Sequence, residues 1–119
     1  MKKITMFVFL ASAFGLNAQV CFNIDTSWVA APNANCIISS DFNADGKLDL
    51  ATSNYDPSSQ NSSVSVLLGT GTGTFLPSIT YTTNGSANSI CSADFNHDGK
   101  QDVAVSDGSN NAVIFLPGN

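Results

Sequence analysis

A nine-residue stretch of closely spaced oxygen-bearing side chains occurs twice in the chain, at 41–49 and at 94–102. Both copies read D-x-N-x-D-G-x-x-D, so carboxylate or amide oxygens recur at loop positions 1, 3, 5 and 9. If the backbone coils around one centre, these oxygens converge on it, and the carbonyl oxygen of position 7 adds a fifth donor. Glycine at position 6 permits the sharp turn with positive φ that a side chain would resist. The candidate ligands are Asp41, Asn43, Asp45, Lys47 and Asp49 in the first copy, and Asp94, Asn96, Asp98, Lys100 and Asp102 in the second.

These donors have the chemistry that a hard cation requires. All-oxygen ligation rich in carboxylate, with neither His nor Cys, favours Ca²⁺ or Mg²⁺, and the number of ligands suits Ca²⁺ better. Asn and Asp-Gly are also ordinary turn residues, so a pair of plain hairpin turns is the competing interpretation. Because both copies keep every ligand position, the sequence predicts two calcium sites. EF-hand and dockerin loops begin in the same way, but they need an acidic residue at position 12, where this chain has Thr52 and Val105.

The N-terminus has the pattern of a secretory signal peptide. Lys2 and Lys3 form a positive n-region, a mostly apolar run follows, and Ala18 provides a small residue for cleavage before Gln19. The apolar run is too short for a comfortable membrane span, and no later stretch is apolar for long enough to cross a bilayer. We therefore expect a signal peptide at 1–18 and a secreted, extracellular or cell-surface protein.

The negative charge of the chain is concentrated in the two loops. There are nine Asp and no Glu, and six of the nine lie in the repeated stretches. No Arg occurs, and removal of residues 1–18 leaves Lys47 and Lys100 as the only lysines against nine aspartates, a net charge of −7. A surface this acidic repels phosphate backbones, which argues against a nucleic-acid partner.

Three cysteines, Cys21, Cys36 and Cys91, make an odd count for an exported chain. One disulfide with one free thiol fits this count, and so do buried thiols without partners, which behave as small apolar residues. The sequence leaves the pairing open.

The sequence holds no catalytic constellation, and we expect a protein that is not an enzyme. His97, the only histidine, lies at loop position 4, where the other copy has Ala44, so it should point to solvent. A catalytic triad would have to use this histidine. The Gly-Thr run at 69–74 lacks the lysine and the spacing of a phosphate-binding loop, and we interpret it as a turn.

The chain contains an internal repeat. A shift of 53 residues lays 34–53 on 87–106 with 13 of 20 positions identical. A period near 50 residues is typical of architectures in which each unit packs on its neighbour. Two units are therefore expected, at 19–74 and at 75–119, with the second slightly truncated.

Local composition predicts strands in both units. Runs rich in β-branched or aromatic residues lie at 27–29, 35–40, 48–53, 64–68, 79–82 and 112–116. Clusters of Gly, Asn, Ser and Pro separate these runs, and no stretch keeps a helical period over ten positions. Four short strands per repeat match the plan of a propeller blade, with the acidic loop joining two adjacent strands as a hairpin.

Taken together, these features resemble the FG-GAP/VCBS repeat, the blade unit of integrin-α-like β-propellers. The shared features are an aromatic opener (Phe22 and Phe75), D-F-N-x-D-G-K-x-D-[LV]-A, and V-x-V-L-L-G-T-G-T-G-T-F closing into the next repeat. The resemblance covers 22–119 and implies an all-β fold: two four-stranded antiparallel blades of an incomplete β-propeller, preceded by the signal peptide. It also assigns calcium to the ten candidate ligands of the two loops.

The resemblance further implies an adhesion or interaction module that binds an extracellular protein or carbohydrate. The alternative is a non-catalytic accessory or spacer segment of a larger secreted enzyme. Calcium is expected to stabilise the module, because each loop gathers three carboxylates whose mutual repulsion the ion relieves. Two blades cannot close a ring, so we also expect further blades or self-association.

Overall fold

The computed structural model describes residues 28–119, so the predicted signal peptide, Phe22 and Cys21 lie outside the described residues. Within 28–119 the chain forms seven β-strands and no helix, which confirms the all-β prediction. This part of the chain accordingly has no helix that is long and apolar enough to cross a membrane. The strands are β1 (Ala34–Ser40), β2 (Asp49–Asp56), β3 (Asn61–Leu67), β4 (Ile79–Thr83), β5 (Ala87–Ala93), β6 (Asp102–Asp107) and β7 (Ala112–Leu116).

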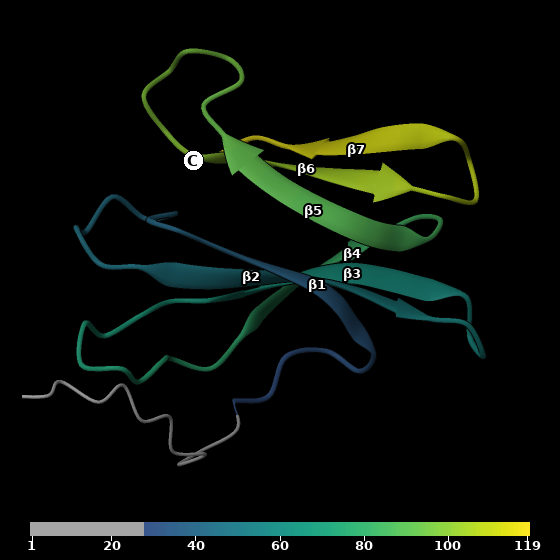
Figure 1. The fold of residues 1–119 in the computed structure, drawn as a ribbon, viewed down its shortest axis with the longest axis horizontal. Coiled ribbons are helices and arrows are strands. Elements are labelled where there is room, and N and C mark those ends of the chain that lie inside the picture. The colour runs from purple at the N-terminus through teal and green to yellow at the C-terminus, as the bar shows by residue number, and fades with distance from the viewer. Residues whose placement is uncertain (1–27) are drawn as a thin grey trace, which may run out of the picture.

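The strands form two antiparallel sheets in which neighbours follow chain order (Figure 1). The first sheet has the order β1-β2-β3-β4, and the second has the order β5-β6-β7. The same irregularity recurs in both, a register shift between Ala34 and Cys36 in β1 and between Ala87 and Ser89 in β5. The two sheets are therefore copies of one unit in structure as well as in sequence.

The second sheet differs from the prediction of two four-stranded blades, because it has three strands. The segment expected to open the second repeat, β4, instead pairs with β3 and completes the first sheet. The sheets consequently divide between Thr83 and Ala87, and not at the sequence boundary between 74 and 75. The physical reason is the turn before β4, where Gly69 and Phe75 form a β-bridge that directs the chain back along β3.

The segment before β1 also differs from its prediction. Trp28 and Val29, expected to belong to a strand, form none. Instead, the ring of Trp28 packs edge-on against Phe75, with 6.0 Å between centroids and 75° between planes. The two repeat positions therefore have different structures, because β4 has an edge of β3 to pair with and the segment at 28–29 does not.

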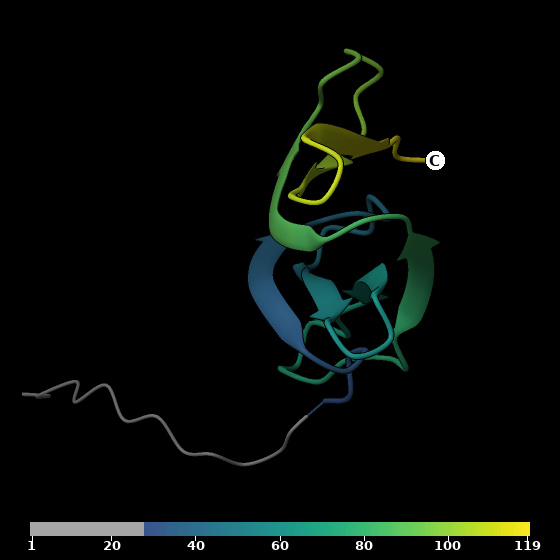
Figure 2. The same cartoon turned by 90° about the vertical axis from the view of Figure 1, so that its right-hand side faces the viewer.

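The apolar core lies between the two sheets (Figure 2). Direct cross-strand neighbours share a face, so the pairings of Ala51 with Ile38 and Val66 place these three side chains on one side of the first sheet. The first sheet contributes Cys36, Ile38, Ala51, Val64 and Val66 to the core, and the second contributes Ala87, Ile90, Val103, Val105, Ile114 and Leu116. Sheet-on-sheet packing of this kind positions the two acidic loops side by side.

The core predicts that two valines at equivalent repeat positions differ sharply in how much they stabilise the fold. Val64 is fully buried, whereas Val113 is 70% exposed. Val64→Ala is expected to lower the free energy of unfolding by about 2 kcal/mol, because it removes two buried methyl groups and leaves a cavity. Val113→Ala should change it by less than about 0.5 kcal/mol. Urea denaturation in dilute solution measures both, and equal losses would contradict this assignment of the core.

Candidate metal centre

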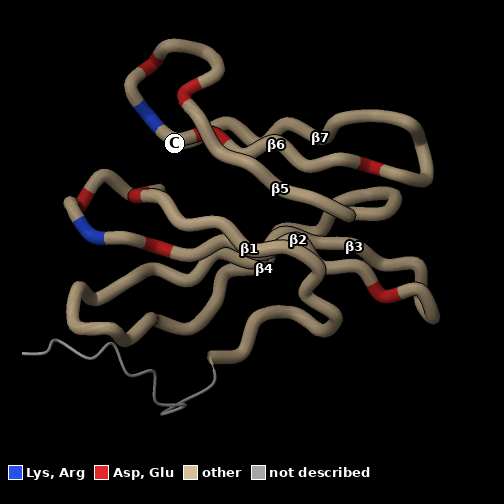
Figure 3. Tube along the Cα trace, in the orientation of Figure 1, with Lys and Arg blue, Asp and Glu red and all other residues tan. Residues whose placement is uncertain are grey.

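The two acidic loops lie at the same end of the two sheets (Figure 3). The first joins β1 to β2, and the second joins β5 to β6. In each loop the residues at positions 1 to 8 are exposed or half-exposed, whereas the aspartate at position 9 is buried. The expected placement is therefore observed, because each loop is the turn of an antiparallel hairpin.

The side chains at positions 1 and 3 converge on one backbone amide in the first loop. The N–H of Asp45 donates to Asp41 Oδ1 and to Asn43 Oδ1, both at 3.1 Å. The N–H of Gly46 donates to Asp41 Oδ2 at 2.8 Å, and that of Lys47 donates to Asp45 Oδ1 at 2.9 Å. Backbone N–H groups thus hold the oxygens of the predicted metal ligands at positions 1, 3 and 5 around a single turn.

The second loop repeats this pattern with different neighbours. The N–H of Asp98 donates to Asp94 Oδ1 at 3.1 Å and to Asn96 Oδ1 at 2.9 Å. The N–H of Gly99 donates to Asp94 Oδ2, and that of Lys100 donates to Asp98 Oδ1, each at 2.9 Å. Because positions 4 and 8 differ between the loops, the shared pattern belongs to the motif itself.

The aspartate at position 9 fixes each loop to the body of its sheet. Asp49 has no exposed surface; its Oδ2 accepts from the N–H of Phe42 at 2.9 Å, and its Oδ1 from the N–H of Gly69 at 2.7 Å. Asp102 is equally buried and accepts from the N–H groups of Phe95 at 2.9 Å and Gly118 at 2.8 Å. One carboxylate therefore connects the start of the loop, the second strand and the glycine that comes shortly after the third strand.

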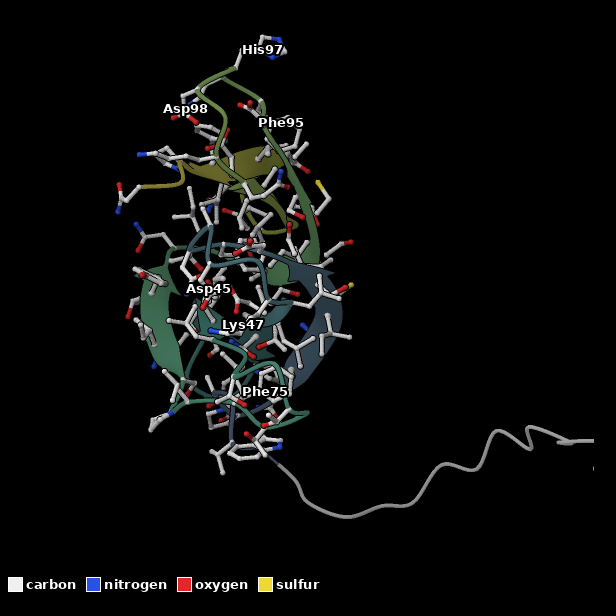
Figure 4. The ribbon with its side chains drawn as sticks, turned by 90° about the vertical axis from the view of Figure 1, so that its left-hand side faces the viewer. Asp45, Lys47, Phe75, Phe95, His97 and Asp98 are labelled. Carbon is white, nitrogen blue, oxygen red and sulfur yellow. The ribbon has the colours of Figure 1, made fainter. Side chains whose placement is uncertain are left out.

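Two positions of each loop adopt the left-handed backbone conformation. Gly46 and Gly99 have φ of 82° and 85°, as the turn predicted at position 6 requires. Position 4 also has positive φ, at 57° in Ala44 and 62° in His97, which the sequence did not suggest. His97 is exposed at the tip of its loop and points away from the protein, which confirms its predicted orientation (Figure 4).

The carboxylates at position 5 are stabilised in their ionised form by different contacts. The Lys47 ammonium donates to Asp45 Oδ2 at 2.9 Å, and this bond lowers the pKa of Asp45 below its usual value (Figure 4). In the second loop the backbone N–H of Lys100 lowers the pKa of Asp98, and the amide of Asn96 adds a bond to Asp98 Oδ2 at 3.0 Å. Both side chains are therefore negatively charged at neutral pH.

The donor set of the loops fits a hard cation. Each loop has three carboxylates and one lysine, and within 28–119 the only ion pair is that of Lys47 with Asp45. No three acidic, histidine or cysteine side chains gather as a metal cluster in this part of the chain, and the aspartate at position 9 bonds to backbone amides. The oxygen types present in the loops, carboxylate, amide and backbone carbonyl, are those that Ca²⁺ accepts in flexible geometry.

The other acidic residues of the described part of the chain lie at the opposite end of the sheets (Figure 3). Asp56 accepts hydrogen bonds from the hydroxyls of Ser58 and Ser59 within its own turn, and these bonds lower its pKa to about 2. Asp107 accepts from the backbone N–H of Ser86 and from the side chain and backbone of Asn110. The contacts of Asp56 are those of an ordinary turn, which makes this residue a useful control for the loop aspartates.

Sequence reasoning missed Gly69 and Gly118 as partners of the loops. Both glycines come shortly after the third strand of their sheets and correspond in the repeat, which is the signal that could have found them. A Cβ on Gly69 would collide with the backbone carbonyl of Leu48, so only glycine allows its N–H to approach Asp49.

A family model described as an FG-GAP-like repeat matches residues 41–105. The match begins at the first aspartate of the first loop, spans both loops and ends within β6. The chain belongs to the FG-GAP-like repeat family, which confirms the resemblance seen in the sequence. Together with the two antiparallel sheets, this membership defines a repeat module of the β-propeller type. No curated protein and no solved structure matches the chain.

The approach of Gly69 to the first loop leads to a prediction. Gly69→Ala is expected to lower the free energy of unfolding by roughly 1–3 kcal/mol, because the added methyl group meets backbone that cannot move aside. Gly108→Ala is the matched control, since its methyl group would meet mainly the flexible side chain of Asn88. Thermal unfolding monitored by circular dichroism measures both changes. A loss for Gly69→Ala no larger than that for Gly108→Ala would contradict the proposed role of Asp49 as a fixed attachment.

Proposed function

We propose that the chain is a secreted, calcium-binding repeat module of the β-propeller type that serves in adhesion or interaction rather than in catalysis. Each acidic loop would bind one Ca²⁺. The oxygens of positions 1, 3, 5 and 9 and the carbonyl of position 7 would hold it, from Asp41 to Asp49 in the first loop and from Asp94 to Asp102 in the second. The ion would supply positive charge that offsets the three carboxylates of its loop.

The observation that carries this proposal is the identity of the hydrogen bonds in the two loops. Six bonds from backbone N–H groups to the oxygens of positions 1, 3, 5 and 9 occur in both. A plain hairpin turn needs no such set of oriented carboxylates. Donors that are oriented beforehand lose less conformational entropy on binding, which favours capture of an ion.

The interaction role is supported by family membership and by the nature of the loops. The chain belongs to a repeat family, and units of repeat proteins pack on their neighbours to build extended binding surfaces. An extracellular protein or a carbohydrate is the proposed partner. The second candidate, an accessory or spacer segment of a larger secreted enzyme, uses the same module, and a catalytic domain encoded in the same reading frame would favour it.

Calcium binding is tested by calorimetry on the folded chain. Two equivalents of Ca²⁺ are expected per chain, with Kd on the order of 10⁻⁴ M as in extracellular modules. Asp45→Ala and Asp98→Ala should each remove one equivalent, and the double variant should remove both, because these carboxylates lie in separate loops. In about 1 mM Ca²⁺ each occupied site should stabilise the fold by roughly 1.4 kcal/mol, a gain that chelation abolishes.

Asp56→Ala is the matched control for this experiment. It removes one acidic side chain from a turn outside the loops and should leave both binding equivalents in place. Uptake that is lost equally in Asp56→Ala and in Asp45→Ala would indicate unspecific attraction by net charge. No uptake by the folded unsubstituted chain would remove the proposal of calcium binding.

Export gives a separate prediction. The positive n-region and the apolar run before Ala18 should direct the chain out of the cytoplasm, with a new N-terminus at or shortly after Gln19. N-terminal sequencing of protein recovered from the export fraction measures this directly. Recovery of Met1 at the N-terminus of that protein would show that the segment is not cleaved.

A further inference from the structure

We propose that Asn84 is a modification site, at which the side-chain amide is converted spontaneously to a carboxylate and the link between the two sheets is weakened. Asn84 and Gly85 lie between β4 and β5, where the chain passes from the first sheet to the second (Figure 2). The co-reactant is water, and no enzyme or cofactor takes part. The proposal is independent of calcium binding and of the role in adhesion or interaction.

The reaction joins the side chain to the backbone of the next residue. The nitrogen of Gly85, once hydroxide has removed its proton, attacks the side-chain carbonyl carbon Cγ of Asn84. A new C–N bond closes an imide ring, and the bond from Cγ to the amide nitrogen breaks, which releases ammonia after that nitrogen takes a proton from water. Water then opens the ring at either carbonyl carbon and leaves aspartate or isoaspartate, whose backbone runs through Cγ. Glycine favours ring closure because it has no Cβ to block the approach of its nitrogen.

The hydrogen bonds of the fold select Asn84 from four candidate pairs. Asn-Gly or Asp-Gly occurs at 45–46, 84–85, 98–99 and 107–108. An Asp-Gly pair follows the same route with loss of water and also gives isoaspartate. In every pair the nucleophile is the glycine nitrogen, so the reaction is slow where the N–H of that glycine already donates a hydrogen bond. That bond must break before the nitrogen can attack, and local opening of a folded turn requires free energy.

The glycine nitrogens of the three Asp-Gly pairs are engaged in this way. The N–H groups of Gly46 and Gly99 donate to the aspartate at position 1 of their own loops, at 2.8 Å and 2.9 Å. The N–H of Gly108 donates to the carbonyl oxygen of Ser86 at 3.1 Å. The fold therefore protects all three pairs.

The pair at 84–85 lacks such protection. Asn84 is exposed, and its side chain makes no hydrogen bond within residues 28–119. The N–H of Gly85 also has no acceptor in this part of the chain, whereas the next N–H, that of Ser86, donates to Asp107 Oδ1 at 2.9 Å. The two groups that must react are therefore both without hydrogen bonds, while the residue that follows them is fixed.

The buried carboxylate of Asp107 fixes the same link to β6. Asp107 is 4% exposed, and its carboxylate lies so close to Gly85 that a Cβ on this glycine would collide with it. The carboxylate accepts from the N–H of Ser86 and from the side-chain amide of Asn110 at 2.7 Å. Both products of the reaction at Asn84 place a second negative charge near this carboxylate, and like charges repel. Isoaspartate also lengthens the backbone of the link by one methylene group, so the modified chain should unfold at a lower temperature.

Peptide mapping by mass spectrometry tests the site on the 119-residue chain, processed as the expressing cell leaves it and stored with a chelator in mildly alkaline buffer. The peptide with 84–85 should gain the mass difference between an amide and a carboxyl group and separate into two products. Storage in urea gives reference rates, because unfolding removes the hydrogen bonds of all four glycines. Asn84 should convert at similar rates in the folded and unfolded chains. Isoaspartate formation at the three Asp-Gly pairs should be at least about tenfold slower in the folded chain.

Asn84→Gln is the matched control, because it keeps the amide but would have to close a larger ring. Stored in parallel, this variant should show no conversion at position 84 and keep its midpoint of thermal unfolding, while the unsubstituted chain shows a lower midpoint after storage. If folding slows the conversion of Asn84 as much as it slows the Asp-Gly pairs, the choice of site is overturned. Equal losses of thermal stability in the two chains, or none after Asn84 has converted, would overturn the effect on the link between the sheets.

Discussion

The fold and the candidate metal centre both depend on a buried carboxylate at the last position of each acidic loop. Asp49 and Asp102 have no exposed surface, and each accepts hydrogen bonds from two backbone amides that are distant in the chain. Burial of a polar group is costly unless it is hydrogen-bonded, so these contacts strongly restrict the local geometry. The loop, the second strand and the chain after the third strand are therefore fixed together.

A second constraint is that the two sheets, although built from the same sequence repeat, differ in which repeat positions they bury. Identical positions are buried in the first sheet and exposed in the second, as Val64 and Val113 show. In the other direction, Thr52 and Ser65 replace the apolar residues that the second sheet buries, and the N–H of Ala31 donates to the Ser65 hydroxyl. This difference comes from a few side-chain differences between the repeats, and the pairing of the first three strands is the same in both sheets.

The doubled motif was sufficient to predict the hairpin loops, the glycine turn at position 6 and the all-β fold, because all three depend on local spacing. The sequence marks Gly69 only by its repeat counterpart Gly118, since Gly69 and Asp49 lie 20 residues apart and meet only in the folded state. The prediction that the β4 segment belongs to the second blade was wrong for the same reason. Its composition predicts a strand, but only the availability of the β3 edge decides which sheet it joins. The ion ligands of the loops remain a prediction.

The central claim is that a cation bound in the loop stabilises the sheet through the buried aspartate. Amide exchange measured by nuclear magnetic resonance during a calcium titration tests it most directly. The account predicts that the amides of Gly46 and Gly99 shift and saturate with calcium, while those of Gly69 and Gly118, bonded to Asp49 and Asp102, become more protected from exchange. Loop amides that do not respond to calcium, or unchanged exchange at Gly69 and Gly118, would contradict it.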